Sequence, residues 1–265
     1  MSEIKVNSIK GVGASAAAIT VNNTDGTCTA NITSINGGSI GTKNLIMNGA
    51  FTVAQKTTNY LGAVASSTTS GYNVFDRWQV NHSVQAAPTT AQVDVASGTS
   101  PYTLGFRKAL KITNGNQSSG ATASTIFYIR QFIESQDIAT SGWNYTDPNS
   151  KITLSFWIKS SVAQSFHGHL KTYDGTEQIF PFQTGSLSAN TWTKITKVIP
   201  GNSNLQFDTD TTTNAADRGL AVVVAPYMGT TYTDSSATFD QWQTNSSGIF
   251  AGTDMTTTWY TTNAS

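Results

Sequence analysis

One loop, S-G-W-N-Y-T-D-P-N (residues 141–149), places two aromatic rings beside polar side chains. Its candidate residues for ligand contact are Trp143, Asn144, Tyr145 and Asp147. Aromatic faces stack on the apolar C–H face of a saccharide, while amides and carboxylates bond its hydroxyl groups. The loop is therefore the first candidate for sugar binding. The alternative is structural: the rings cap the end of a β-sandwich, and Trp143 packs against the strand that follows.

The segment P-Y-M-G-T-T-Y (residues 226–232) is a second candidate of the same kind. It offers two rings, Tyr227 and Tyr232, on either side of a glycine turn.

Two histidines, His167 and His169, lie two positions apart on a predicted strand and so face the same side of it. Two imidazoles on one side are able to bind a transition metal. The nearest third ligand in the sequence is Asp174. The simpler interpretation, which we favour, is a pair of surface histidines without a ligand.

The acidic loop F-D-T-D-T-T-T-N-A-A-D carries Asp208, Asp210 and Asp217. Oxygen-rich loops of this kind hold Ca²⁺ in many proteins. The spacing does not match the twelve-residue helix-loop-helix calcium site, and an ordinary solvated loop is the alternative.

Two patterns typical of catalysis are absent from the sequence: it has no G-x-x-x-x-G-K and no H-E-x-x-H. A glycosidase needs two carboxylates at a set separation. Glu134, Asp137, Asp174 and Glu177 supply carboxylates, but nothing in their spacing predicts such a pair. We therefore expect a binding or structural protein and not an enzyme, with no cofactor other than a possible calcium ion.

The composition favours an all-β chain that binds neither nucleic acid nor membrane. Abundant Thr and aromatic residues favour strands, and Gly, Asn, Asp and Ser favour turns. Charged residues make up 11% with zero net charge, and the 15 basic residues are scattered, whereas phosphate binding requires a basic cluster. No apolar run approaches the length of a membrane span, and the N-terminus lacks the apolar core of a signal peptide. We expect assembly in a cytoplasm.

Two parts differ in composition, residues 1–43 and residues 44–265. No Trp, Tyr or Phe precedes Phe51, and short alternating runs such as Ile19 to Val21 are separated by Gly and small residues. Such a segment cannot bury enough apolar area to fold alone, so its strands need a partner surface. The alternative is a flexible, partly ordered leader.

From Asn44 onward, many short strands separated by turn signals predict a sandwich or jelly roll. Trp78 and Trp157 are expected in its core, and Arg77 is expected to pair with Asp76 or a backbone carbonyl. Gln131–Ile138 is expected to hold a helical turn. The predicted strands are 44–54, 78–84, 90–95, 108–113, 125–132, 151–160, 164–173, 193–199 and 219–224.

Four motifs occur in order along this second part: N-L-I-M-N-G-A-F, F-D-R-W, T-L-S-F-W-I-K-S-S and N-T-W-T-K-I-T-K-V-I-P-G. Together they resemble a family of tailed-bacteriophage fiber and virion-appendage proteins. The resemblance implies a carbohydrate-binding-module-like jelly roll preceded by a slender N-terminal β segment. It implies a virion location, a homotrimer, attachment to other virion proteins through residues 1–43, and binding of host-surface polysaccharide. Fibers of this kind also bind iron through H-x-H pairs at a trimer axis, and sugar-binding jelly rolls carry structural calcium.

Two functions follow from the resemblance. The first is a tail fiber or fiber tip that binds host-surface glycan, and the alternative is a capsid-surface fiber or decoration protein with a purely structural role. Family members usually continue beyond a segment like Thr256 to Tyr260 into a further apolar strand, so we expect either a truncated chain or a strand supplied by a neighbour.

Overall fold

The structure is a computed structural model that describes residues 8–9, 19–21, 24, 28–30, 34–35, 38–39, 44–61, 69–83, 88–115, 122–207 and 218–245. The chain divides into two compact units, residues 1–43 and residues 44–265. Within the described residues, no helix is long and apolar enough to cross a membrane.

The N-terminal unit contains very short antiparallel strands. β1 (Ser8–Ile9), β2 (Ile19–Val21) and β3 (Cys28–Ala30) form one sheet, and β4 (Ser34–Ile35) pairs with β5 (Gly38–Ser39). Ile9 is 54% exposed, and Ile19 and Val21 are only half-buried. Strands of two or three residues bury little apolar area, which agrees with the weak core predicted for this part.

The C-terminal unit is a β-sandwich, and its larger layer is a seven-stranded antiparallel sheet. The strand order in this sheet is β17-β14-β13-β16-β11-β8-β7. Its members are β7 (Thr69–Gly71), β8 (Trp78–Ser83), β11 (Ile126–Ile133), β13 (Ser165–Thr172), β14 (Gln178–Ser186), β16 (Leu220–Met228) and β17 (Gln243–Thr244).

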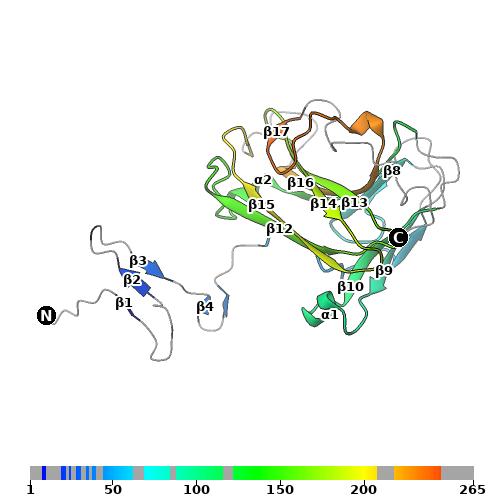
Figure 1. Ribbon diagram of the computed structural model, residues 1–265, viewed down its shortest axis with the longest axis horizontal. Coiled ribbons are helices and arrows are strands. Elements are labelled where there is room, and N and C mark those ends of the chain that lie inside the picture. The colour runs from blue at the N-terminus through cyan, green and yellow to red at the C-terminus, as the bar shows by residue number, and fades with distance from the viewer. Residues whose placement is uncertain are drawn as a thin grey trace. The chain divides into compact units, whose positions relative to one another are not determined.

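The second layer consists of two separate sheets. β12 (Lys151–Ile158) pairs with β15 (Thr193–Pro200), and β9 (Thr89–Asp94) pairs with both β10 (Lys108–Thr113) and β6 (Asn59–Leu61). Figure 1 shows α1 (Ser100–Thr103) at the end of the unit where β9 and β10 lie. The other helical segments are α2 (Ser135–Ala139), within the predicted helical stretch, and the 3-10 turn η1 (Thr230–Tyr232).

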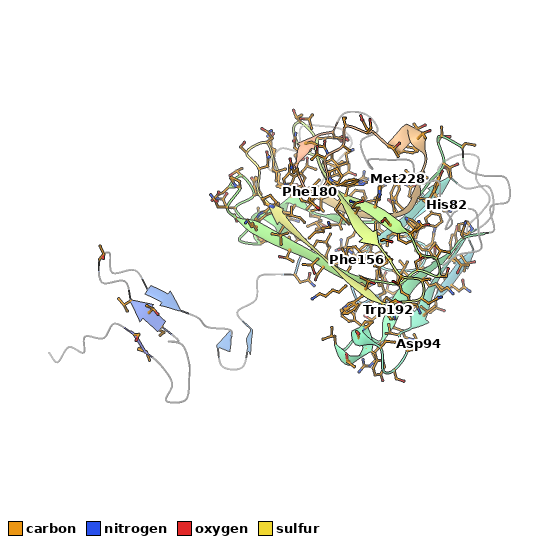
Figure 2. The ribbon with its side chains drawn as sticks, viewed as in Figure 1. His82, Asp94, Phe156, Phe180, Trp192 and Met228 are labelled. Carbon is orange, nitrogen blue, oxygen red and sulfur yellow. The ribbon has the colours of Figure 1, made fainter. Side chains whose placement is uncertain are left out.

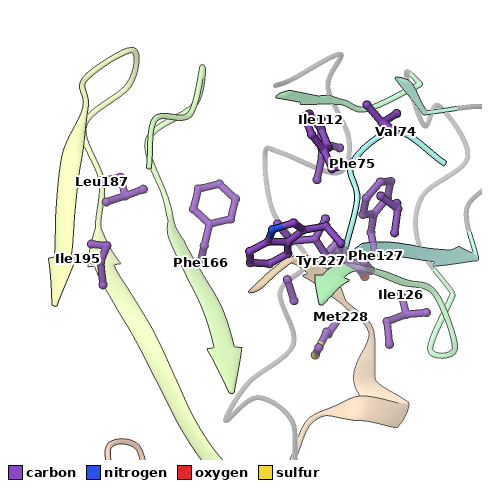
Figure 3. Packing of buried hydrophobic residues seen from close by; sticks show 14 residues of the cluster. Val74, Phe75, Ile112, Ile126, Phe127, Phe166, Leu187, Ile195, Tyr227 and Met228 are labelled. Carbon is purple, nitrogen blue, oxygen red and sulfur yellow. The ribbon is translucent and has the colours of Figure 1, made fainter. Parts of the chain in front are cut away.

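Two clusters of buried residues fill the sandwich. The first cluster joins the large sheet to β10 and β15. In Figure 3, its members Phe166, Leu187 and Ile195 lie on one side of the cluster, and Phe75 and Phe127 lie on the other. The second is built around Phe180, Phe182 and Leu220. Ile46, Phe156 and Val224 contact both clusters, so the two form one continuous core.

The segment 44–54 is not the strand that its apolar residues predict. Residues 47–50 form a turn in which Asn48 (φ 50°) and Phe51 (φ 54°) take left-handed backbone conformations. Side chains bond this backbone in place of a neighbouring strand: Gln131 Oε1 accepts from Met47 N at 2.7 Å, and Asn48 Oδ1 accepts from Val53 N at 3.1 Å. The other predicted strands are present, with ends shifted by a few residues.

β14 lies outside the predicted strands and carries Pro181 in its middle, although proline cannot donate to a strand ladder. The structure accommodates Pro181 because β17 pairs only with Gln178 and Ile179, so no ladder continues along that edge at Pro181.

Trp157 was predicted to lie in the core, and this prediction is wrong. Along β12 the core contacts come from Ile152, Leu154, Phe156 and Ile158, whereas Trp157 shares the opposite face with exposed Ser155. Trp78, by contrast, is 7% exposed, and its Nε1 donates to the carbonyl oxygen of Asn48 at 3.3 Å.

The two tryptophans should therefore respond very differently to truncation. Trp78→Ala should lower the free energy of unfolding by about 3–5 kcal/mol, the usual range for a buried large aromatic residue. Trp157→Ala should lower it by only about 1 kcal/mol. Urea unfolding of both variants tests this, and equal losses would contradict the assignment of faces.

Asn48 should be hard to replace, because its side chain bonds two segments while its backbone is left-handed. Asn48→Ala should cost about 2–4 kcal/mol, combining lost hydrogen bonds of about 1 kcal/mol each with the steric cost of a left-handed alanine. Asn48→Gly, which accepts the backbone angle, should cost about 1 kcal/mol less. Urea unfolding separates the two contributions, and identical losses would show that the backbone angle is unimportant.

Candidate functional site

The Trp143 ring is enclosed within the sandwich. It is 7% exposed and belongs to the second core cluster, with its ring centroid 6.3 Å from that of Phe207. Its Nε1 donates to the carbonyl oxygen of Ser150 at 3.3 Å. We correct the expectation of an exposed ring at this position: no face of Trp143 is open for stacking, and the ring caps the end of the sandwich.

The rest of this loop is bonded to itself and to the turn after β15. Tyr145 is half-buried and packs edge-on against Phe207, with the two ring centroids 4.9 Å apart. Its backbone carbonyl oxygen accepts from Asn202 N at 2.7 Å. Asn144 is exposed, while Asp147 Oδ1 accepts from Asn149 N at 2.9 Å. The structure therefore leaves Asn144 as the exposed polar group of this candidate site.

The second candidate segment, residues 226–232, does not join the 141–149 loop in one site. Tyr227 is 1% exposed within the first core cluster, where β16 pairs it with Phe127, and Tyr232 is half-buried in η1 against that cluster. Burial removes the Tyr227 ring from contact with any ligand, so the expectation of an accessible ring is corrected there too.

His167 and His169 lie side by side on β13, as predicted, but they are not surface residues. They are 6% and 3% exposed on the outer face of the large sheet. Phe239 packs edge-on against His167 at 5.4 Å. Burial, followed by the positive charges of Lys171 and Arg130, lowers the pKa of His169 to about 3. The same charges oppose a metal cation beside His169.

The proposed metal sites gain no further ligands from the described residues. Across the described ranges, His, Cys, Asp and Glu do not gather in a group of three that would hold a metal ion. Asp208, Asp210 and Asp217, the calcium candidates, lie outside the described residues.

A pocket of about 230 Å³ opens beside the F-D-R-W turn. Val74 and Phe75, each 2% exposed, lie at its base, and Tyr72, which is 41% exposed, is its accessible aromatic residue. The volume suits one sugar ring, since pockets for larger drug-sized ligands begin near 300 Å³. The residues that line it are Lys56, Tyr72, Val74, Phe75, Asp76 and Arg77.

The charged groups of this pocket have capacity for a ligand. Asp76 Oδ2 accepts from Gln55 N at 3.3 Å, and Arg77 Nη1 lies 3.4 Å from Glu134 Oε1. The Arg77 side chain is 55% exposed, and a guanidinium carries five N–H donors, so this one long contact leaves most of them open. An aromatic face, a carboxylate and a guanidinium together are the groups that orient a sugar.

Backbone strain gathers next to the same pocket. Arg77 has φ 69°, and Asn48 and Phe51 in the neighbouring turn are also left-handed. Non-glycine residues take this conformation at a cost, and such strain concentrates at functional sites. The F-D-R-W motif by itself predicts a structural role for Asp76 and Arg77, because only the fold brings Lys56 and Tyr72 beside them.

The chain matches no protein-family model, no curated protein and no solved structure.

The buried histidine makes stability depend on pH. The folded pKa of His169 lies below its unfolded value of 6.5, so below pH 6.5 protons bind the unfolded chain in preference. This residue should therefore reduce the free energy of unfolding by about 1.4 kcal/mol per pH unit between 6.5 and about 3, with no effect above 6.5.

Urea unfolding at several pH values between 7.5 and 4 measures this slope. His169→Gln should reduce it by about 1.4 kcal/mol per pH unit. An unchanged slope in the variant would show that His169 is protonated in the folded protein.

Proposed function

We propose that this chain is a structural protein of a bacteriophage virion, a tail fiber or fiber tip whose sandwich binds host-surface glycan. The pocket at Tyr72, Asp76 and Arg77 is the glycan contact. The observation that carries this function is the exposed Tyr72 ring beside charged groups in a pocket the size of one sugar.

Two further features support this assignment. The four motifs that resemble phage fibers lie within the sandwich unit; F-D-R-W lines the pocket, and Asn48 of N-L-I-M-N-G-A-F donates to the carbonyl oxygen of Asp76 beside it. The N-terminal unit has short strands and exposed apolar residues such as Ile9, which suit burial against identical chains or another virion protein.

One sugar-sized pocket supplies little affinity by itself. A homotrimer presents three copies, and linked copies raise the effective concentration at each further site. Binding to a polysaccharide with repeated units would then be strong although each contact is weak, as adsorption to a cell surface requires.

Arg77→Gly separates stability from binding. Glycine relieves the left-handed backbone, and the exposed ion pair to Glu134 contributes little, so the melting temperature should stay equal or rise. Loss of the guanidinium should weaken glycan binding about tenfold, since a hydrogen bond to a charged group is worth about 1.5–3 kcal/mol.

A glycan array on the full chain, followed by adsorption to cells that display the glycan, measures the binding. Tyr72→Ala should also lose binding. Tyr102→Ala is the matched control, because Tyr102 stacks under Arg107 at 3.9 Å and does not line the pocket. Wild-type binding by Arg77→Gly and Tyr72→Ala would overturn the glycan function of this pocket.

A further inference from the structure

Positive charge and aromatic rings gather on the outer face of the large sheet. Along β11, Ile129 and Ile133 enter the core on the inner face, where Phe180 of β14, labelled in Figure 2, is also buried. Arg130 and Phe132 alternate with these isoleucines and therefore take the outer face, and both are half-buried. This part of the sheet presents charged and aromatic groups to its surroundings in place of aliphatic ones.

Two guanidinium groups contact one aromatic ring on this face. The Cζ atoms of Arg130 and Arg218 each lie 4.6 Å from the centroid of the Phe132 ring. Arg218 is exposed and comes two residues before β16, the strand that pairs with β11 in the sheet. The two guanidinium groups are therefore separated by no more than twice their distance from the ring.

No described carboxylate neutralises these two guanidinium groups. Lys171, on the strand beyond β16, pairs with Glu177 at 2.8 Å, and Arg130 Nε donates to Gln79 Oε1. Within the described part of the chain, neither Arg130 nor Arg218 forms an ion pair. A guanidinium has five N–H donors, so most donors of both arginines are open to a ligand.

The hydroxyl of Tyr173 lies near the same charges. Its ring packs edge-on against Phe132, with the centroids 5.6 Å apart, and Lys171 Nζ lies 4.9 Å from the Tyr173 ring centre. Burial raises the pKa of Tyr173 to about 12, while the nearby Arg130 and Arg218 act to lower it. The hydroxyl is therefore protonated at neutral pH and adds a neutral hydrogen-bond donor beside two positive charges.

These groups suit an oxyanion that is attached to a sugar. Guanidinium groups bind carboxylate, sulfate or phosphate oxygens by paired hydrogen bonds, and partial burial strengthens the attraction because water screens it less. Two arginines are too few for nucleic acid, whose binding requires a larger basic patch. The half-buried rings add apolar surface, which a sugar contacts through its C–H groups.

The cluster borders the pocket proposed for glycan. Gln79, which bonds Arg130, follows Arg77 by two residues in the sequence. Arg77 Nη1 in turn contacts Glu134, which follows Phe132 by two residues. Arg77 therefore lies between the pocket that it lines and the cluster around Phe132.

We propose that Arg130, Arg218 and Tyr173 form a second subsite, which binds the anionic group of an acidic polysaccharide. The polysaccharide as carrier of the anion rests on the function proposed above, whereas the anion site rests on the contacts around Phe132. The host glycan is then a polymer that carries carboxylate, sulfate or phosphate groups and not a neutral one.

Thermal melting of the full chain in sodium sulfate, with sodium chloride at equal ionic strength as reference, tests the anion site. At about ten times its dissociation constant, sulfate should raise the melting temperature of the wild type by about 3–6 °C more than that of Arg218→Gln. The general stabilising effect of sulfate acts on both proteins and cancels in this difference.

Arg107→Gln is the matched control, because it removes the same charge from an exposed arginine that also lies over a ring, that of Tyr102 at 3.9 Å. It should keep the full response of the wild type. Equal responses of the wild type and Arg218→Gln would overturn the site. The measurement contains no sugar, so its result does not depend on the glycan pocket.

Titration calorimetry with dextran sulfate and unmodified dextran tests the polysaccharide. The wild type and Arg107→Gln should bind dextran sulfate at least about tenfold more tightly than dextran, and Arg218→Gln should weaken binding of dextran sulfate about tenfold. Equal affinity for the two polymers, or a response to sulfate without binding of dextran sulfate, would overturn the assignment to an acidic polysaccharide. Tighter binding to phosphatidylglycerol vesicles than to dextran sulfate would assign the site to lipid and would also overturn it.

Discussion

The Asn48 side chain joins the two segments on which the sandwich depends. The side-chain Nδ2 donates to the carbonyl oxygens of Val53 at 2.9 Å and Asp76 at 3.1 Å. The backbone carbonyl oxygen of Asn48 accepts from Trp78 Nε1. Trp78 begins β8, which pairs with β11 at the centre of the first core cluster. One amide therefore sets where a central strand starts and how its first side chain enters the core.

The pocket takes its shape from the same turn. The backbone reverses between Phe75 and Trp78, where Trp78 N donates to the carbonyl oxygen of Phe75 at 3.3 Å, and Asp76 N donates to that of Val53 at 3.4 Å. Arg77 becomes left-handed and its side chain points to solvent, while Phe75 is driven into the core. The strain at Arg77 is tolerated because the flanking residues are held by packing and hydrogen bonds on both sides.

The outer face of the large sheet is covered at β13 and β14, and this explains why His167 and His169 are buried. Two-residue alternation is typical of a strand with one face in water, so His167 and His169 were expected at the surface. The segment after η1 crosses their face: Phe239 contacts His167, and Asp240 N bonds the carbonyl oxygen of Pro181 at 2.8 Å. No local pattern around β13 indicates this cover, because it comes from more than sixty residues away.

The sequence by itself determined most of the longer strands and the change in composition at residue 43, because alternation, turn residues and aromatic content are local properties of the chain. It predicted β8, β10 and β15 closely and placed Trp78 in the core. Only the tertiary structure decided which rings are accessible. Trp143 is enclosed and Trp157 faces outward, although both follow strand or loop patterns that fit either outcome. Burial depends on which distant segment packs against a residue, and the hydrophobic periodicity of a strand does not indicate which segment that is.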